Sequence, residues 1–259
     1  YFLSIAKRFN DNHQLTLTAF GAPQTHYQRS SYDGLSIKGW QQVKNYMRGD
    51  SPYKYNATYG FGKNGERKTS QYNEYHKPQI SLNHLWQIDS KSSLSTALYM
   101  SIGRGNGYSG QGDKDHSSMW FGSSDGVLNT TFRNADGTFA YDQIQDMNEQ
   151  SETGSKMVMS KNLNNHMWYG LLSTYTTKFG DNFDFYGGID FRYYKGLHQN
   201  KIIDLYNGAY YIDRYRASVK AENYAGAGTD EFKNKKMQVD DVVYRDYDGF
   251  VMSEGVFAQ

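Results

Sequence analysis

The chain contains no cysteine and only three prolines among its 259 residues. The absence of cysteine excludes disulfide frameworks, thiol nucleophiles and cysteine-ligated metals, and leaves histidine and carboxylate sites open. No run approaches the roughly 20 apolar residues of a membrane-spanning helix. The first residues, YFLSIAKRFN, have neither an initiator methionine nor the layout of a signal peptide, and the last residues resemble a strand without a stop signal. We therefore expect a section of a longer polypeptide.

An excess of charge of either sign is also missing. The 28 Lys and Arg residues nearly balance the 27 Asp and Glu residues, so no bulk field favours nucleic acid, and we expect no such partner. Aromatic residues, by contrast, make up 16% of a chain whose mean hydropathy is −0.82. Disordered chains are poor in aromatics. The combination predicts short apolar strands joined by long polar segments.

Apolar and polar side chains alternate in about seven stretches, which is the pattern of half-buried β-strands. In FDFYGGIDFRYY, at 183 to 194, phenylalanine and isoleucine fall on one face and Asp184, Asp190 and Arg192 on the other. In the strand predicted at 80 to 88, His84 lies on the apolar side and Leu85 on the polar side as exceptions. Further strands are predicted at 15–19, 94–102 and 169–179, with weaker ones at the two ends of the chain.

The connections between these strands alternate in length. Short turns rich in Asn, Asp and Gly lie at 10–13, 89–92 and 180–182. Between the hairpins are three polar segments, at 21–72, 103–166 and 196–247, each far longer than the roughly 15 residues typical of a loop in a compact domain. Short turns on one side and long loops on the other are typical of an antiparallel transmembrane β-barrel. On this interpretation the apolar face meets lipid and the polar face lines the lumen.

Several runs resemble the barrel of TonB-dependent outer-membrane receptors of Bacteroidota, of the type with a carboxypeptidase-regulatory-like extension. The resemblance covers most of the chain, is weakest at 220–240, and does not specify a substrate. The runs that carry it are TLTAFGAPQTHYQRSS (16–31), YNEYHKPQISLNHLW (72–86), IGRGNGYSGQG (102–112), STYTTKFGDNFDFYGGIDFRYYKG (173–196) and LYNGAYYIDR (205–214).

The resemblance implies a barrel of about 22 strands, closed by a plug and opened when the TonB complex pulls on a box near the N-terminus. No plug, TonB box, regulatory-like domain or closing C-terminal strand is apparent, so residues 1–259 are expected to be an interior, partial section of the barrel wall, with about seven strands and long extracellular loops. The implied location is the outer membrane of a Gram-negative cell. The implied partners are outer-membrane lipid, the TonB complex through the plug region, and a surface lipoprotein.

A glycine motif, G-x-G-x-x-G at Gly105, Gly107 and Gly110, follows an apolar run. In a dinucleotide-binding fold such a turn must lead into a helix within a βαβ unit. Here QGDKDHSSMWFGSSDG follows, without a helical period, so the motif fails this test. We interpret the glycines as the mobile base of an extracellular loop.

Acidic clusters and histidines give no clear site. Carboxylates could hold calcium, but neither acidic group has the full calcium-loop pattern, and a solvated loop accounts for both. The histidines lack metal-ligand spacing, and no nucleophile elbow is present, so neither a metal, a cofactor nor an enzymatic activity is expected. Asp184 and Asp190 are interpreted as a channel lining paired to Arg192 rather than as glycosidase acids. The acidic groups are Asp113, Asp115 and His116, and Asp240, Asp241, Asp246 and Asp248.

Aromatics in the long segments could form stacking surfaces for a sugar, a peptide or a protein. The alternative is that they pack the loops against one another or form the outer aromatic girdle. The candidate ligand-binding residues are Trp40, Tyr46, Trp120, Tyr210 and Tyr211, with Tyr53, Tyr55, Tyr59, Phe121 and Tyr206 in the same segments.

The function expected from these observations is energised uptake of a nutrient through the barrel, by binding and gated passage. One alternative is a barrel that serves as a structural platform for surface lipoproteins. An alternative of another class is a soluble glycan-binding β-sandwich, whose outward faces should be polar and whose loops should be shorter.

Overall fold

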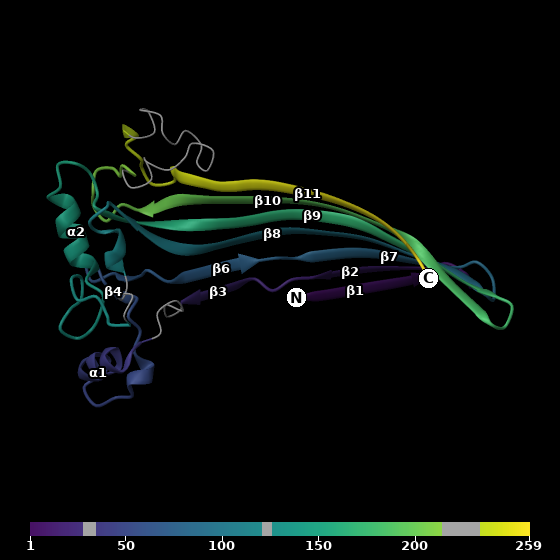
Figure 1. Ribbon diagram of the computed structural model, residues 1–259, viewed down its shortest axis with the longest axis horizontal. Coiled ribbons are helices and arrows are strands. Elements are labelled where there is room, and N and C mark those ends of the chain that lie inside the picture. Colours follow the sequence, from purple (N-terminus) through teal and green to yellow (C-terminus); the bar gives the residue numbers. More distant parts are fainter. Residues whose placement is uncertain (28–34, 121–125, 214–233) are drawn as a thin grey trace.

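The computed structural model of the chain describes residues 1–27, 35–120, 126–213 and 234–259. Their main feature is one antiparallel sheet of long strands (Figure 1). Its strands are β1 (Phe2–Arg8), β2 (His13–Phe20), β3 (Gln24–Tyr27), β6 (Tyr72–His76), β7 (Gln79–Gln87), β8 (Ser92–Gly112), β9 (Met157–Phe179), β10 (Phe183–Asp204) and β11 (Val242–Ala258).

These nine strands occupy seven side-by-side positions, in the order β1-β2-β7-β8-β9-β10-β11. β3 continues β2, and β6 continues β7, since β3 pairs with β6 and β6 pairs with β8 beside β7. Each interruption contains a proline, Pro23 or Pro78, which has no N–H to donate to a ladder. The prediction of antiparallel strands joined in chain order is confirmed.

The sheet is open within the described residues. β1 pairs only with β2, and β11 pairs only with β10, so these two strands form its edges. A closed barrel is therefore not present in this part of the chain. The short turns lie together at one end of the strands, where the sequence predicts them, and the long connections lie at the other end (Figure 1).

The predicted strand limits at the long-connection end are wrong. β8 runs on to Gly112 and β9 begins at Met157, so much of the segment 103–166 is strand. Likewise β10 continues to Asp204 and β11 begins at Val242. Gly105, Gly107 and Gly110 consequently lie inside β8 and not at a mobile loop base. The extensions escape prediction for two reasons. Residues 103–112 are glycine and polar residues without apolar alternation, and residues 157–160 are all buried, which removes the alternation there.

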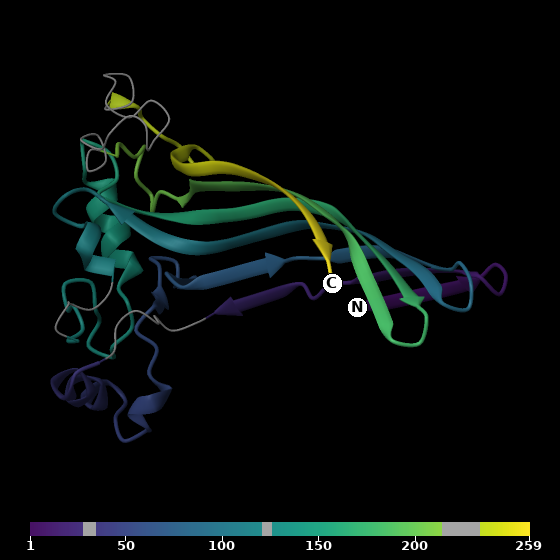
Figure 2. The same cartoon turned by 45° about the vertical axis from the view of Figure 1, so that its right-hand side comes forward.

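The long connections fold into a compact layer over the ends of β8, β9 and β10 (Figure 2). We call this layer the cap and define it as residues 35–69, 113–120, 126–156, 205–213 and 234–241. Of the helices in the described residues, none is long and apolar enough to cross a membrane. The cap contains α1 (Ile37–Tyr46), the 3-10 helices η1 (Pro52–Lys54) and η2 (Ser117–Trp120), α2 (Tyr141–Glu149) and the hairpin of β4 (Tyr59–Phe61) and β5 (Arg67–Thr69).

The apolar core of the described chain lies between the cap and these strand ends. Alternate residues of β9 divide it, because Met157 and Met159 join one buried cluster and Val158 joins the other. The first cluster holds Trp120, Phe132, Phe139, Ala140, Tyr141, Ile144, Met157, Met159 and Tyr206. The second holds Val158, Ile202, Leu205, Tyr211, Met237 and Val243. At this end the sheet is therefore covered on both faces.

Gly110 shows why the glycine-rich stretch occurs in β8. The ring of Trp120 lies flat against this strand, and a Cβ at Gly110 would sit 2.4 Å from Cδ2 of that ring. The indole Nε1 donates a hydrogen bond to the carbonyl oxygen of Gln111 at 3.0 Å. Glycine is thus required at position 110 for packing against an aromatic ring, and not for cradling a phosphate.

Candidate functional site

The middle of the sheet has one apolar and one polar face. Residues opposite one another on neighbouring strands share a face, as do alternate residues of one strand. We define the apolar face as Leu3, Ile5, Leu15, Leu17, Ala19, Ile80, Leu82, Trp86, Leu94, Leu98, Met100, Ile102, Met167, Tyr169, Leu171, Tyr175, Ile189, Phe191, Tyr193, Phe250, Met252 and Val256. The opposite, polar face carries mainly Ser, Thr, Asn, Gln, Asp and Arg.

The apolar face forms a continuous band across the strands. One row across the sheet reads Ile5, Leu17, Leu82, Leu98, Leu171 and Phe191. The band reaches from Leu94 to Ile102 on β8, which is about 26 Å along the strand at about 3.3 Å per residue. A strand tilt of about 40° would make the band about 20 Å tall, close to the roughly 25 Å of outer-membrane barrels.

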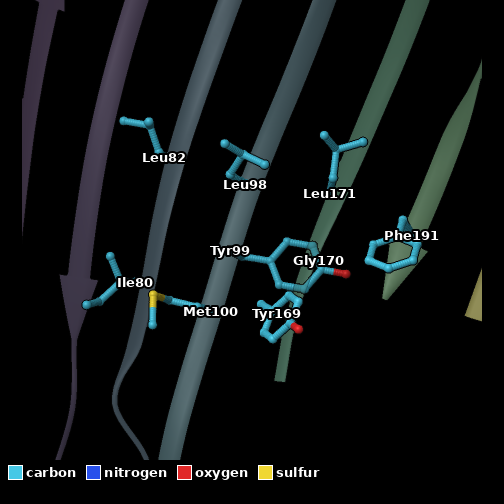
Figure 3. A pocket seen from close by; sticks show the side chains of 9 residues that line it. All are labelled: Ile80, Leu82, Leu98, Tyr99, Met100, Tyr169, Gly170, Leu171 and Phe191. Atoms are coloured by element: carbon cyan, nitrogen blue, oxygen red, sulfur yellow. The ribbon is translucent and has the colours of Figure 1, made fainter. Parts of the chain in front are cut away.

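No other layer of the described chain covers this band. In Figures 1 and 2, neither a helix nor a second sheet of the described part lies over the middle of the strands. Leu98 and Ile189, in the middle of the band, are 48% and 50% exposed. Their neighbours line a shallow apolar hollow of about 490 Å³, which includes Leu82, Met100 and Tyr169 (Figure 3).

Charged groups lie at the cap end of the band, and histidines interrupt it toward the short turns, where His84 lies between Leu82 and Trp86. Toward the cap, Arg104 and Lys195 are exposed on the same face, next to Ile102 and Met167. Toward the short turns, His13 and His84 stack, with Nδ1 and Nε2 3.1 Å apart. His84 was expected on the apolar side, near an interface or hydrogen-bonded, and its hydrogen bond is present.

A row of polar side chains, His84, Thr96 and Ser173, crosses the band, and an acidic exception to its apolar character lies on its edge strand. Glu254 of β11 stands opposite Phe191 and between Met252 and Val256 on the same face. An ionised carboxylate that faces hydrocarbon must be neutralised or paired. The backbone of β11 has a free side at this position among the described strands, where a further strand could bring a partner.

The polar face carries an aromatic and arginine cluster at the level of Met100. Tyr99 of β8 extends across Gly170 of β9, and its hydroxyl accepts a hydrogen bond of 3.3 Å from Nε of Arg192 on β10. The guanidinium of Arg192 also lies 5.8 Å from the ring centroid of Trp168. Because a Cβ at Gly170 would sit 2.5 Å from the Tyr99 ring, this position needs glycine (Figure 3).

The predicted pairing of Asp184 and Asp190 with Arg192 is found only in part. The charge of Asp190 acts on Arg192, but no salt bridge joins these two residues in the described contacts. Asp184 lies 3.6 Å from Nζ of Lys178 near the short turn. Arg192 instead donates a hydrogen bond to Tyr99. The side chain of Tyr99 can extend across β9 to Arg192 because Gly170 has no side chain. The sequence interpretation overlooked this contact, since it joins residues from two different hairpins.

Comparison of the chain with protein-family models, curated proteins and solved structures gave no match.

The structure separates the five predicted ligand-binding aromatics. Trp120 and Tyr211 are 2% and 0% exposed in the two buried clusters, so they present no stacking surface here. For these two residues, packing of the loops explains the aromatic side chain.

Tyr46 and Tyr210 are half-buried and engaged in packing. Tyr46 stacks on Tyr55, and the ammonium of Lys236 lies 4.5 Å from the ring centroid of Tyr210. Burial raises the pKa of Tyr55 to about 12, although Arg133 Nη1 donates to its hydroxyl at 2.8 Å. These contacts stiffen the cap.

Trp40 keeps accessible surface at the outside of the cap. It is half-buried on α1, and its ring lies 5.3 Å from that of Tyr53, which is 70% exposed. Of the predicted aromatics in the described chain, Tyr53 is the most exposed, so this pair is the part of the aromatic surface that is most accessible to a ligand. Phe121 lies outside the described residues.

Within the described residues, the two acidic groups do not form a cation site. In the described residues no three His, Asp or Glu side chains are arranged to hold a metal ion. Asp113 instead pairs with Nδ1 of His116 at 2.6 Å and with Nζ of Lys156 at 3.6 Å. Asp240 lies 3.6 Å from Nζ of Lys201, and the side chains of 246 and 248 lie outside the described part.

Proposed function

We propose that this chain is a section of the wall of a transmembrane β-barrel, in a receptor-like protein that takes up a nutrient across an outer membrane. The observation that carries the proposal is the contrast between the two parts of the sheet. At the cap, apolar side chains such as Met157, Met159 and Val158 are covered by protein on both faces. In the band, apolar side chains such as Leu98 and Ile189 are not covered by another protein layer of the described chain.

Exposed apolar surface of this extent is unfavourable in water, at about 25 cal/mol per Å². Contact with hydrocarbon removes that cost without a second protein layer. The height of the band, the charged margin at its cap end and the short turns at its other end all agree with a barrel wall. The polar face, with Tyr99, Trp168 and Arg192, would then line the lumen.

The soluble glycan-binding sandwich is supported less well. A sandwich places a second sheet over its apolar face. The second sheet of the described chain is the small β4-β5 hairpin, and it belongs to the cap.

The ordered cap fits either a receptor or a platform for a surface lipoprotein. Its buried cores would fix an outer surface, carrying Trp40 and Tyr53, in one conformation. A fixed surface loses little entropy on binding. Gated transport additionally requires that a substrate pass through the lumen of the barrel. A structural platform does not require this.

Fractionation of cells that express the intact protein tests the proposal. We expect the protein to stay with the outer membrane through carbonate and urea washes and to be released by detergent. Release into aqueous buffer would contradict the membrane assignment. If the protein is retained, uptake assays with a panel of glycans and peptides separate a transporter from a platform.

A further inference from the structure

The cap-side margin of the band contains a cationic groove. Ile102, Arg104, Asn165, Met167, Lys195 and Leu197 line a hollow of about 220 Å³ that spans β8, β9 and β10. Ile102 stands opposite Met167, and Met167 stands opposite Lys195, so the groove continues the apolar face directly. Arg104 and Lys195 thus lie directly on the cap side of the apolar side chains of the band.

These two cations have no carboxylate partner among the described residues. Some other basic side chains near the cap are paired, as Lys68 is with Asp204 at 2.7 Å and Lys63 with Glu149 at 2.6 Å. Arg104 also borders a separate hollow with Glu74, but the Glu74 carboxylate accepts a hydrogen bond from Tyr72 and lies beyond salt-bridge distance of Arg104.

Asn165 adds an oriented donor to the groove. Its Oδ1 accepts a hydrogen bond of 3.3 Å from the backbone N–H of Gly105. This contact fixes the amide and leaves its Nδ2 group as the donor on the other side. The groove therefore offers a guanidinium, an ammonium and an amide N–H, all suited to anionic oxygen atoms.

The spacing of the cations suits a group of the size of a phosphate. Arg104 and Lys195 are two strands apart and staggered along them, so their Cα atoms are on the order of 12 Å apart. Both side chains are long and flexible, and they can approach one phosphate from two sides. Arginine can contact it with two N–H groups, and lysine acts as a point charge.

The groove leads straight into the apolar hollow of Figure 3. Ile102 and Met167 line the groove, and Met100 and Tyr169, two residues farther along the same strands, line the hollow. A ligand that filled both would have an anionic head and an apolar tail. Resting on the membrane assignment above, we propose that this margin is a specific site for a phosphorylated acyl lipid, with the phosphate between Arg104 and Lys195 and an acyl chain along Met100 and Tyr169.

Native mass spectrometry of the intact protein in detergent tests this site. The probes are dioleoyl phosphatidic acid, dioleoylglycerol with the same chains but no phosphate, and inorganic phosphate. We expect phosphatidic acid to bind at least about tenfold more tightly than dioleoylglycerol. Tenfold corresponds to about 1.4 kcal/mol, which charged hydrogen bonds to one phosphate supply. Millimolar inorganic phosphate should not displace the lipid.

Matched variants locate the effect. The double variant Arg104→Gln and Lys195→Gln should lose at least about tenfold in affinity for phosphatidic acid, whereas Lys195→Arg should retain it. Lys91→Gln, which removes an exposed cation at the short-turn end, should change nothing. Circular dichroism checks that each variant is folded.

Three results would overturn the site: equal binding of dioleoylglycerol, displacement by inorganic phosphate, or an equal loss in Lys91→Gln. Displacement by inorganic phosphate would indicate a free-anion site instead. If any of these is found in a protein that fractionates with the membrane, only this inference fails. A protein that fractionates as water-soluble would remove the membrane assignment first.

Discussion

The most informative substitution places a charge in the middle of the apolar face. Leu98 is 48% exposed and lies between Leu82 and Leu171 on the neighbouring strands. It is about 13 Å along β8 from Ile102, or about 10 Å below the cap-side margin at a tilt of about 40°. If the sheet is the barrel wall proposed above, an arginine at this depth has to be accommodated in hydrocarbon.

The expected cost of Leu98→Arg depends on what surrounds the sheet. On the lipid face of a barrel, arginine near the bilayer midplane costs about 2–4 kcal/mol, and the cost falls to about 0–1 kcal/mol near the interfaces. On a water-exposed surface, a substitution at a half-exposed position costs about 0.5 kcal/mol plus the lost packing of one leucine. We therefore expect Leu98→Arg to lower the free energy of unfolding by about 2–4 kcal/mol, and Ile102→Arg to lower it by about 1 kcal/mol or less.

Guanidinium titration of the intact protein refolded into liposomes, followed by tryptophan fluorescence, measures these differences. Ser95→Arg is the matched control, because Ser95 is exposed on the polar face of the same strand and should cost less than about 1 kcal/mol. The reasoning is refuted if Leu98→Arg and Ser95→Arg cost the same. It is also refuted if Ile102→Arg is as costly as Leu98→Arg, since the cost would then be independent of depth.

Three further predictions concern the cap and the polar face. Gly110→Ala brings a Cβ to 2.4 Å from Trp120 and should destabilise the cap by about 1–3 kcal/mol. Gly107→Ala, with its nearest atom at 3.4 Å, should be tolerated, and guanidinium denaturation curves of the two variants distinguish them. Gly170→Ala should break the Tyr99 to Arg192 hydrogen bond and lower the thermal midpoint, while Gly255→Ala, with its nearest atom at 3.8 Å, should not; equal midpoints would contradict the packing argument. Burial opposes ionisation of Asp113, but the hydrogen bond with His116 and the charge of Lys156 outweigh it and hold the pKa of Asp113 below its usual value. The stabilising contribution of Asp113 is therefore present above about pH 4 and is lost as the pH falls through the lowered pKa. Asp113→Asn should flatten that acid dependence of cap unfolding, and an unchanged acid profile would show that the ion pair contributes nothing.

The strands of the band could be predicted from the sequence because one face alone is apolar there. The alternation at 183–194 correctly divides Ile189 and Phe191 from Asp190 and Arg192, and even the exceptions His84 and Leu85 fall on the faces expected. A period of two survives only where the two faces meet different surroundings.

The same argument explains what could not be predicted. At the start of β9, Met157, Val158 and Met159 are all buried, so the alternation disappears and the strand resembles a loop. Helix α2 has no side-chain cap at Ala140 and buries the polar residues Gln145 and Asn148, so it lacks both a start signal and an apolar stripe. Whether an aromatic such as Trp120 fills a core or faces a ligand depends on contacts between distant segments, which the sequence pattern does not contain.

The central claim, that hydrocarbon covers the apolar face, is tested most directly by spin-label accessibility along β10. Residues 1–259 contain no cysteine. Labels can therefore be attached to single cysteines placed one at a time from Ile189 to Tyr194, after any cysteine elsewhere in the intact protein has been replaced by serine. In lipid bilayers, we predict high oxygen accessibility at 189, 191 and 193 and high accessibility to a water-soluble nickel complex at 190, 192 and 194. Strong access of the nickel complex to 189, 191 and 193 would contradict the account.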